Sequence, residues 1–319
     1  MTSPSETKEQ LEIYSESWEP RRKVLFVFNP VAGKSQIKTD LLDILVTLAG
    51  DSRLITSYPT KCRGDARKTL RNLKEDFHCV ICAGGDGTLD EVVTGMMENP
   101  LNPSIPIGYI PAGTTNDFAS SLGIPTNLKD AAKAAVGGKT FLCDLGRFND
   151  DAYFTYVAAF GIFTGTSYET PQDMKNMLGH LAYILQGMMD LSKIRTYRFH
   201  VESDELSITD DFAFGMITNS KSVGGFSDIT GSRVDLSDGL FEVTLVKMPT
   251  NIFEINDIVQ YFNHTSDTSE LIFQCKTSHI VLESDEPVKW TRDGEYGGAC
   301  KRVELTNLHE KLRIIVPDN

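Results

Sequence analysis

The stretch His78-Cys-Val-Ile-Cys-Ala-Gly-Gly-Asp-Gly-Thr88 decides the fold of this chain. Its apolar first half predicts a buried strand, and the glycines that follow predict a tight turn opening a helix that reaches Met97. Glycine lets a backbone approach a phosphate without obstruction, and a helix N-terminus adds unpaired N–H donors and a partial positive charge. The stretch therefore predicts either a phosphate-binding turn or a plain strand-to-helix connection.

Two further apolar runs, one on each side of this stretch, end in the same kind of turn. Lys23 to Phe28 leads into Asn29-Pro-Val-Ala-Gly-Lys34, and Ile105 to Ile110 leads into Pro111-Ala-Gly-Thr-Thr-Asn-Asp-Phe-Ala119. Segments with helical spacing separate the three strands, which predicts crossover connections and a mainly parallel sheet. Ligands of such sheets bind at the carboxyl ends of the strands, so we expect the three turns to form one site.

Beyond about residue 140 the sequence changes to short alternating segments, such as Tyr153–Ala159, and it ends with the apolar strand Leu312–Val316. This pattern predicts an antiparallel β-sandwich or barrel, interrupted by a helix at residues 172–192. We therefore expect an α/β chain of two domains. The expected parts are an N-terminal extension (1–22), a doubly wound, mainly parallel, Rossmann-like nucleotide-binding domain (23–140), an antiparallel β-sandwich domain (141–305) and a C-terminal strand that could return to the N-terminal domain (306–319).

Composition limits the class of partner and the compartment. The net charge of −13 argues against nucleic acid as a partner. No apolar run approaches the roughly 18 residues of a membrane span, and the first ten residues are polar. The six cysteines form no disulfide or zinc framework. These features predict a cytoplasmic protein that is neither exported nor inserted in a membrane.

Charge is distributed unevenly along the chain. Residues 21–80 carry 12 Lys and Arg against 6 Asp and Glu, a local charge of +6, whereas the rest carries 19 against 38. The basic segment is either a solvated face or a surface that meets phosphates or an anionic membrane. The second alternative predicts peripheral association with the inner face of the membrane.

Several side chains in the three turns suit phosphate chemistry. Asp86 lies inside the central turn, where a carboxylate would repel phosphates unless a cation such as Mg2+ bridged them. Lys34 can reach a phosphate as a point charge, and Asp117 could orient a metal-bound water or an acceptor. Either Thr115 or Asn116 is expected to cap the following helix.

Together, the three strings resemble the catalytic domain shared by diacylglycerol, sphingosine and ceramide kinases, in order and in spacing. The resemblance covers residues 23–319, and the soluble bacterial diacylglycerol kinases are similar in length. It implies the two-domain fold of the NAD kinase and diacylglycerol kinase type, with ATP in the interdomain cleft and Mg2+ as cofactor. The implied reaction transfers the γ-phosphoryl group of ATP to a lipid hydroxyl, above all that of diacylglycerol, giving phosphatidic acid. The bacterial relatives make a homodimer plausible.

The resemblance also implies nucleotide-binding residues, position by position. Family members contact ATP through the first turn, a threonine after the second strand, the central loop and the third turn. The matching residues here are Asn29, Pro30, Val31, Ala32, Gly33, Thr60, Gly84, Gly85, Asp86, Gly87, Thr88, Leu89, Asp90 and Thr114. One of them departs from the family, because Asp90 stands where Asn is usual, which replaces a donor and acceptor with an acceptor alone.

A metal turn is implied in the second domain. By itself, the acidic string Arg233-Val-Asp-Leu-Ser-Asp-Gly-Leu240 is typical of a solvated loop. It is similar, however, to the Asp-x-x-Asp-Gly-Leu turn of the bacterial enzymes. The resemblance implies a structural magnesium bound by Asp235, Asp238 and the backbone carbonyl of Leu240.

A catalytic base is implied near the end of the chain. In Trp290-Thr-Arg-Asp-Gly-Glu295, the dipeptide Asp-Gly predicts a turn, and the resemblance implies that Asp293 is the general base. Phosphoryl transfer passes through a loose transition state, so one carboxylate that accepts the hydroxyl proton suffices. Asp86, Asp117 and Lys34 complete the predicted catalytic set.

Two alternatives to a lipid kinase remain open. One is an NAD kinase-like enzyme acting on a soluble nucleotide, which the Thr-Thr-Asn-Asp string disfavours. The other is a catalytically silent nucleotide-binding regulatory protein, which the joint presence of Asp293, Asp86 and Lys34 disfavours. The segment Met174–Ile194, rich in flexible apolar residues, is expected to be either a core helix or one that lines an acyl-chain groove or rests on the bilayer.

Overall fold

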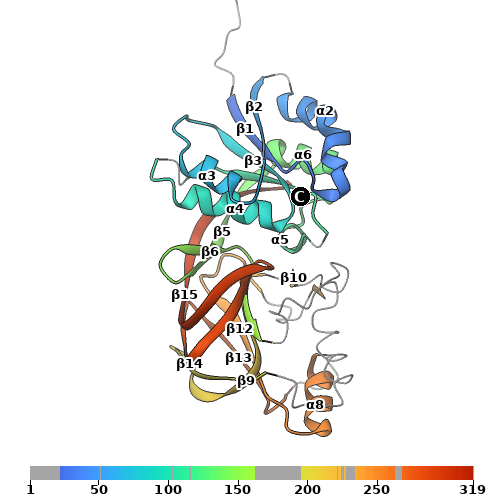
Figure 1. Cartoon of the computed structure of the whole chain (residues 1–319). Coiled ribbons are helices and arrows are strands. Elements are labelled where there is room, and N and C mark those ends of the chain that lie inside the picture. Colours follow the sequence, from blue (N-terminus) through green and yellow to red (C-terminus); the bar gives the residue numbers. More distant parts are fainter. Residues whose placement is uncertain are drawn as a thin grey trace, which may run out of the picture.

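The computed structural model describes residues 22–50, 52–101, 104–114, 116–161, 195–220, 222–223, 226–227, 234–262 and 268–318. Figure 1 shows two lobes stacked one above the other, with the N-terminal part of the described chain in the upper lobe and the strand-rich remainder in the lower lobe. The extension at residues 1–21 and the helix expected at residues 172–192 lie outside the described residues.

The upper lobe is built on four parallel strands. They are β1 (Arg22–Phe28), β2 (Arg53–Pro59), β3 (Cys79–Gly84) and β4 (Ile107–Pro111), in the order β4-β3-β1-β2. β3 is buried along its whole length, as expected of a parallel strand covered on both faces. The parallel pairing predicted for the three strands that end in glycine turns is observed.

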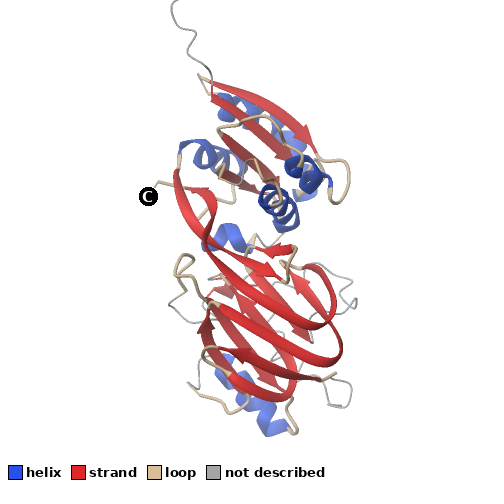
Figure 2. Ribbon diagram, turned by 90° about the vertical axis from the view of Figure 1, so that its left-hand side faces the viewer, coloured by secondary structure: helices blue, strands red, loops and turns tan. Residues whose placement is uncertain are grey.

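Helices connect these strands and lie on either side of them (Figure 2). They are the short 3-10 helix η1 (Gly33–Ser35), α2 (Gln36–Ala49), α3 (Asp65–Arg71), α4 (Asp86–Met97), α5 (Asp117–Ser121) and α6 (Leu128–Gly137). α2 packs against α6, and α3 packs against α4. α4 begins two residues earlier than predicted, so Asp86 belongs to its first turn.

The lower lobe is antiparallel in every pairing among its described strands. Its elements are β5 (Lys139–Phe148), β6 (Ala152–Phe154), β7 (Val157–Gly161), β8 (Tyr197–Ser203), β9 (Ser207–Thr218), β10 (Ser222–Val223), β11 (Phe226–Ser227), β12 (Phe241–Lys247), α8 (Ile252–Phe262), β13 (Ile272–Thr277), β14 (His279–Arg292) and β15 (Glu295–Val316). Trp290, Phe160 and Phe199 pack against one another at its centre.

The long strand β15 joins the two lobes. It pairs with β14 and β5 in the antiparallel sense, and its end pairs in parallel with β4, where Ile314 lies beside Ile107. A single 13-stranded sheet therefore runs through both lobes. The sequence predicted two short strands here, Val303–Leu305 and Leu312–Val316. A polar bulge between Leu308 and Leu312, with Glu310 at a positive φ of 50°, interrupts the apolar alternation between them.

The described chain is thus α/β, with its parallel strands in the upper lobe and antiparallel strands below. Within the described residues, the longest apolar helical segment falls short of what a membrane crossing requires.

Candidate active site

A cleft lies where the three glycine turns meet, at the carboxyl ends of β1, β3 and β4. Its volume is about 870 Å3. Glu295, the first residue of β15, reaches it from the lower lobe. The predicted nucleotide-binding residues that line it are Asn29, Pro30, Val31, Ala32, Gly33, Thr60, Gly85, Gly87, Thr88, Asp90 and Thr114.

The remaining predicted residues lie beneath or beside this cleft. Gly84 and Leu89 are buried under its floor, with Leu89 in the hydrophobic core. Asp86 is half-buried in the first turn of α4. Lys34 belongs to η1 at the end of the first turn, and its side chain and all of Thr115 lie outside the described residues.

Close packing of the turns explains two of their glycines. Gly33 has a φ of +59°, and a Cβ atom there would lie 2.9 Å from the carbonyl oxygen of Ala112. A Cβ atom at Gly85 would lie 3.2 Å from Cα of Gly113. The glycines therefore allow the three turns to touch, in addition to leaving room for a ligand.

The third turn is closed by an asparagine side chain. Asn116 Oδ1 accepts a hydrogen bond from the N–H of Gly113 at 2.8 Å, and Asn116 Nδ2 donates to the carbonyl of Gly113 at 3.0 Å. Asn116 itself has a positive φ of 53° and makes no side-chain cap to α5. Asn116 is therefore the N-cap residue of α5, one of the two predicted, but its side chain holds the turn that lines the cleft instead of bonding to the helix.

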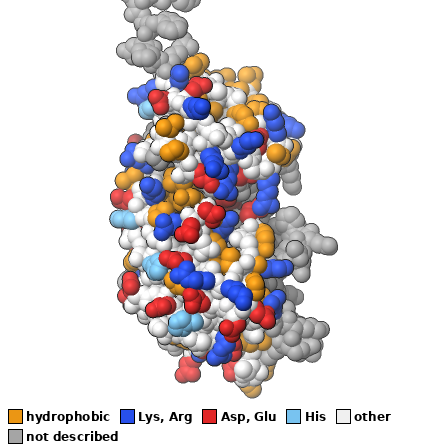
Figure 3. Space-filling model, turned by 60° about the vertical axis from the view of Figure 1, so that its left-hand side comes forward, with side chains coloured by type: hydrophobic (Ala, Val, Ile, Leu, Met, Phe, Trp, Pro, Cys, Tyr) orange, Lys and Arg blue, Asp and Glu red, His pale blue; other side chains and the backbone are white. Residues whose placement is uncertain are grey.

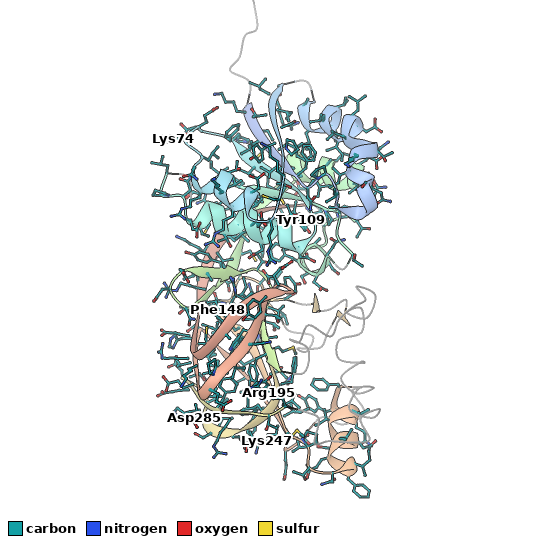
Figure 4. The ribbon with its side chains drawn as sticks, viewed as in Figure 1. Lys74, Tyr109, Phe148, Arg195, Lys247 and Asp285 are labelled. Atoms are coloured by element: carbon teal, nitrogen blue, oxygen red, sulfur yellow. The ribbon has the colours of Figure 1, made fainter. Side chains whose placement is uncertain are left out.

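The three predicted catalytic carboxylates gather around buried tyrosines. Burial raises the pKa of Tyr156 well above its usual value, and the neighbouring charges of Asp86, Asp293 and Asp117 raise it further. The pKa of Tyr109 is raised likewise, by burial and then by Asp86, whose Oδ1 lies 3.5 Å from the phenol oxygen. Tyr109 lies in the part of the upper lobe that faces the lower lobe (Figure 4).

Asp293 lies in a two-residue turn between β14 and β15. Arg292 pairs with Glu295 across the hairpin, and the two residues between them, Asp293 and Gly294, have positive φ values of 47° and 79°. Such a turn, with both central residues left-handed, favours Asp-Gly. The turn predicted from the dipeptide is present, and it brings Asp293 to the tip of the hairpin that meets the upper lobe.

The carboxylate of Asp293 is buried and fully hydrogen-bonded. Oδ2 accepts from the N–H and the hydroxyl of Thr155, at 2.6 and 2.9 Å, and Oδ1 accepts from the N–H groups of Tyr156 and Val157, both at 3.0 Å. Burial raises the pKa of Asp293, whereas these hydrogen bonds lower it. Only the Thr155 hydroxyl can rotate away, so it is the donor that a substrate hydroxyl could replace.

These hydrogen bonds also explain an error in the predicted strands. The sequence indicated one strand over Tyr153–Ala159, whereas the structure breaks it between β6 and β7 at Thr155 and Tyr156. The N–H groups of the break bind Asp293 instead of a neighbouring strand. Nothing in the local pattern reveals a long-range acceptor of this kind.

Asp90, which lines the cleft, is a second carboxylate with a raised pKa, whereas the buried Asp293 is not part of the cleft lining. Burial, followed by the charge of Asp293, raises the pKa of Asp90 to about 7. The charge of Asp293 disfavours ionisation of Asp90, whereas Arg292 and Arg67 favour it, so the site favours a proton or a cation beside the two carboxylates. Lys61 and Arg63 are the cations among the described residues that line the cleft.

The predicted metal turn has hard oxygen donors. Asp235 Oδ1 accepts from the N–H and hydroxyl of Ser237, and Asp238 Oδ1 accepts from the N–H of Leu240. The Nζ atom of Lys276 lies 3.3 Å from Asp238 Oδ2. The donor set suits Mg2+, which would share Asp238 with this ammonium group. No group of three or more His, Cys, Asp or Glu suited to a metal occurs in the described part of the chain.

The sequence did not single out Thr155, Tyr156 and Arg63. Arg63 contacts Glu295 across the cleft. Glu295 is the last residue of the Asp-Gly-Glu string that contains Asp293. No local pattern distinguishes Arg63 from the other basic residues of its segment, because its role depends on a partner more than 200 residues away.

Fold and cleft together define an α/β protein whose three glycine turns meet at one cleft. Residues 23–148 match the family model of the diacylglycerol kinase catalytic domain. The chain is 31% identical over 300 residues to a diacylglycerol kinase of Bacillus subtilis (strain 168), covering 93% of this chain and 97% of the relative. It is also 31% identical over 302 residues to a diacylglycerol kinase of Staphylococcus aureus (strain MRSA252), covering 94% of each.

The fold matches a solved structure as well. The crystal structure of a diacylglycerol kinase from Bacillus anthracis str. Sterne superposes with a TM-score of 0.75 at 24% identity, covering 93% of this chain and 98% of that chain. At this identity the likeness bears on the fold alone. The sequence relatives carry the assignment: this chain belongs to the diacylglycerol kinase family.

Proposed function

We propose that this chain is an ATP-dependent lipid kinase that transfers the γ-phosphoryl group of ATP to the hydroxyl of diacylglycerol, giving phosphatidic acid. The observation that carries the proposal is the meeting of three glycine turns from the upper lobe with the Asp293 hairpin from the lower lobe at one cleft. Membership of the diacylglycerol kinase family supports the same reaction.

ATP is proposed to bind along the turns that line the cleft. The N–H groups of the central loop and the N-terminus of α4 suit its phosphates, because a helix of this length attracts anions to its first turn. Asn29 to Gly33, Thr60 and Thr114 form the remaining walls. Lys34 is proposed to neutralise phosphate charge. Asp86 would hold the Mg2+ that accompanies ATP through bound water molecules. This cation would offset the repulsion between the carboxylate and the phosphates.

Asp293 is proposed to accept the proton of the lipid hydroxyl. Its four hydrogen bonds fix the carboxylate in place, and rotation of the Thr155 hydroxyl would free one lone pair of Oδ2. Asp117, buried at the start of α5, is proposed to help orient this centre. Asp90 would stabilise a cation beside Asp293. This role does not require Asp90 to contact the nucleotide.

The finer architecture is part of the proposal. We divide the chain into a Rossmann-like nucleotide domain (23–140), a β-sandwich domain (141–305) and a returning C-terminal strand (306–319). The parallel order of β1 to β4 and the antiparallel pairings of the lower lobe support this division. We further propose that Asp235, Asp238 and the Leu240 carbonyl hold a structural Mg2+, which would be separate from the ion that arrives with ATP.

A lipid substrate implies contact with a membrane surface. We propose that the protein is cytoplasmic and touches the anionic inner face of the membrane peripherally. Lys and Arg side chains are frequent over the upper lobe on the face drawn in Figure 3, in keeping with the basic balance of residues 21–80. Clusters of basic side chains near a bilayer attract anionic lipids.

One assay tests the proposal. The protein is incubated with γ-labelled ATP and Mg2+, and separately with diacylglycerol in phosphatidylglycerol micelles, sphingosine, ceramide, NAD or no acceptor. Label in phosphatidic acid is the expected result. Label in NADP would instead support the NAD kinase-like alternative, and nucleotide binding without any labelled product would support the regulatory one.

A further inference from the structure

An ion pair crosses the cleft between the two lobes. Arg63, in the connection between β2 and α3, places Nη2 2.8 Å from Oε2 of Glu295, the first residue of β15. Both residues line the cleft. Glu295 follows the Asp293–Gly294 turn directly, so the upper lobe holds the hairpin one residue beyond the turn that carries the proposed base.

The same carboxylate also lies close to the central glycine loop. The other oxygen of Glu295, Oε1, lies 3.2 Å from the position that a Cβ atom would occupy at Gly87, in the first turn of α4. Glu295 therefore rests against the backbone of the central glycine loop. Only glycine leaves this approach open without displacing the carboxylate. Its charge also contributes to the raised pKa of Asp90, as expected of a group held within the cleft.

The pair is too exposed to serve mainly as a stabilising contact. The side chains of Arg63 and Glu295 are 74% and 47% exposed, and ion pairs in such positions contribute little to folding stability. The pair instead holds the hairpin tip in position relative to the upper lobe. The ion pair joins the hairpin tip to the upper lobe beside the glycine loop, and so it bears on the distance between the hairpin tip and the nucleotide turns.

We propose that Arg63 and Glu295 form an interlobe clamp that positions Asp293 for phosphoryl transfer. This inference rests on the proposed function. Arg63 is a positioning residue: it acts through Glu295, and Glu295 carries the β14–β15 hairpin tip against α4. Without the clamp the lobes still fold, but the base and the γ-phosphoryl group are no longer held at a reactive separation. A displacement of about 1 Å between reacting groups can lower a rate by about 100-fold.

A double-mutant cycle tests the clamp. Arg63→Ala, Glu295→Ala and the double variant are each expected to lower kcat with diacylglycerol by about tenfold, with the double variant no worse than either single one. Arg63→Lys, which keeps the charge, should recover most of the rate. The matched control is Arg302→Ala, which removes a similar ion pair to Glu283 on the same hairpin, 3.0 Å long and half exposed, away from the cleft. The control should leave kcat unchanged.

Two outcomes would overturn the clamp. Additive losses in kcat would mean that the two residues act independently. A raised KM for ATP with unchanged kcat in Arg63→Ala would mean that Arg63 serves only the nucleotide.

Amide exchange in the ligand-free protein separates this inference from the proposed function. Peptides that contain residues 293–297 should exchange faster in Arg63→Ala than in wild type or Arg302→Ala, whatever the enzyme phosphorylates. Unchanged exchange would overturn the clamp, whereas wild-type protein that labels no lipid would overturn the kinase proposal.

Discussion

Asp293 combines a structural and a proposed chemical role in one carboxylate. It joins the β14–β15 turn to the break between β6 and β7 through four hydrogen bonds, and a carboxylate has about four acceptor positions. A base whose acceptor positions are all occupied must lose one hydrogen bond before it can accept a proton from the substrate. The hydroxyl of Thr155 is the donor that can leave, since the three N–H groups are fixed by the backbone.

The first prediction concerns Asp293→Asn. Asparagine tolerates the positive φ of the turn, but its amide would point an N–H group at donors, which costs about 1 to 3 kcal/mol of stability. We expect kcat to fall by at least about 100-fold in the fraction that remains folded. The readouts are single-turnover rate, ATP affinity and thermal midpoint.

Asp144→Asn is the matched control for this loss. Because Gly239 belongs to the proposed metal turn, both variants are compared at saturating Mg2+. Asp144 is equally buried, accepts hydrogen bonds from the N–H groups of Gly239 and Glu310, at 2.6 and 2.8 Å, and does not line the cleft. It should lose stability without losing turnover. Equal turnover in Asp293→Asn and Asp144→Asn would remove Asp293 as the base.

The second prediction concerns the pH dependence of stability at Asp90. Its pKa is raised to about 7 in the folded protein and is near 4 when unfolded, so the folded state binds more protons between these values. The wild type therefore loses stability as the pH rises from about 4 to 7, relative to Asp90→Asn, which does not titrate. Between pH 4 and pH 8, without Mg2+, the difference in stability should shift by about 4 kcal/mol in favour of the variant. A difference independent of pH would contradict this account.

At the scale of single elements, the three glycine turns depend on one another. Gly33 needs both a left-handed backbone and an open approach to Ala112, whereas Gly123 has a φ of +66° and nothing within 4 Å of an added Cβ. A left-handed residue other than glycine costs about 1 to 2 kcal/mol. Both Gly33→Ala and Gly123→Ala should therefore lower the thermal midpoint. Only Gly33→Ala should also weaken ATP binding, measured by calorimetry, by about tenfold or more.

The Asp235–Leu240 turn allows a test of the structural metal. If Mg2+ binds there, it should raise the thermal midpoint of the wild type but not of Asp235→Ala/Asp238→Ala, with ATP affinity unchanged in both. Lys276→Met removes the ammonium group that shares Asp238 and should strengthen the Mg2+ dependence. If the double variant and the wild type respond equally to Mg2+, the turn holds no metal.

How far the sequence predicts these elements depends on where their partners lie. The three glycine turns and the Asp293-Gly294 turn are local, and the observed turns agree with their composition. The break at Thr155, the closure of the third turn by Asn116 and the Arg63–Glu295 pair each need a contact or a backbone state that periodicity does not encode. The full length of β15 was missed for a related reason, because a bulge disguises one strand as two.

At the scale of the whole molecule, the strand β15 and the Arg63–Glu295 pair both link the two lobes. β15 runs from the hairpin tip through the lower lobe and into the upper sheet beside β4, so the base and the nucleotide turns share one continuous sheet. The Arg63–Glu295 pair also joins the hairpin to the upper lobe, at the cleft. The strand β15 fixes how the two lobes are placed relative to each other. The exposed ion pair adjusts the distance between Asp293 and the nucleotide turns.

The most direct measurement is a crystal structure with Mg2+ and a non-hydrolysable ATP analogue. We expect the phosphates within hydrogen-bonding distance of the N–H groups at the central glycine loop, with the γ-phosphoryl group facing Asp293 across the cleft. A nucleotide bound elsewhere, or one whose γ-phosphoryl group is separated from Asp293 by more than a lipid hydroxyl could bridge, would contradict the account.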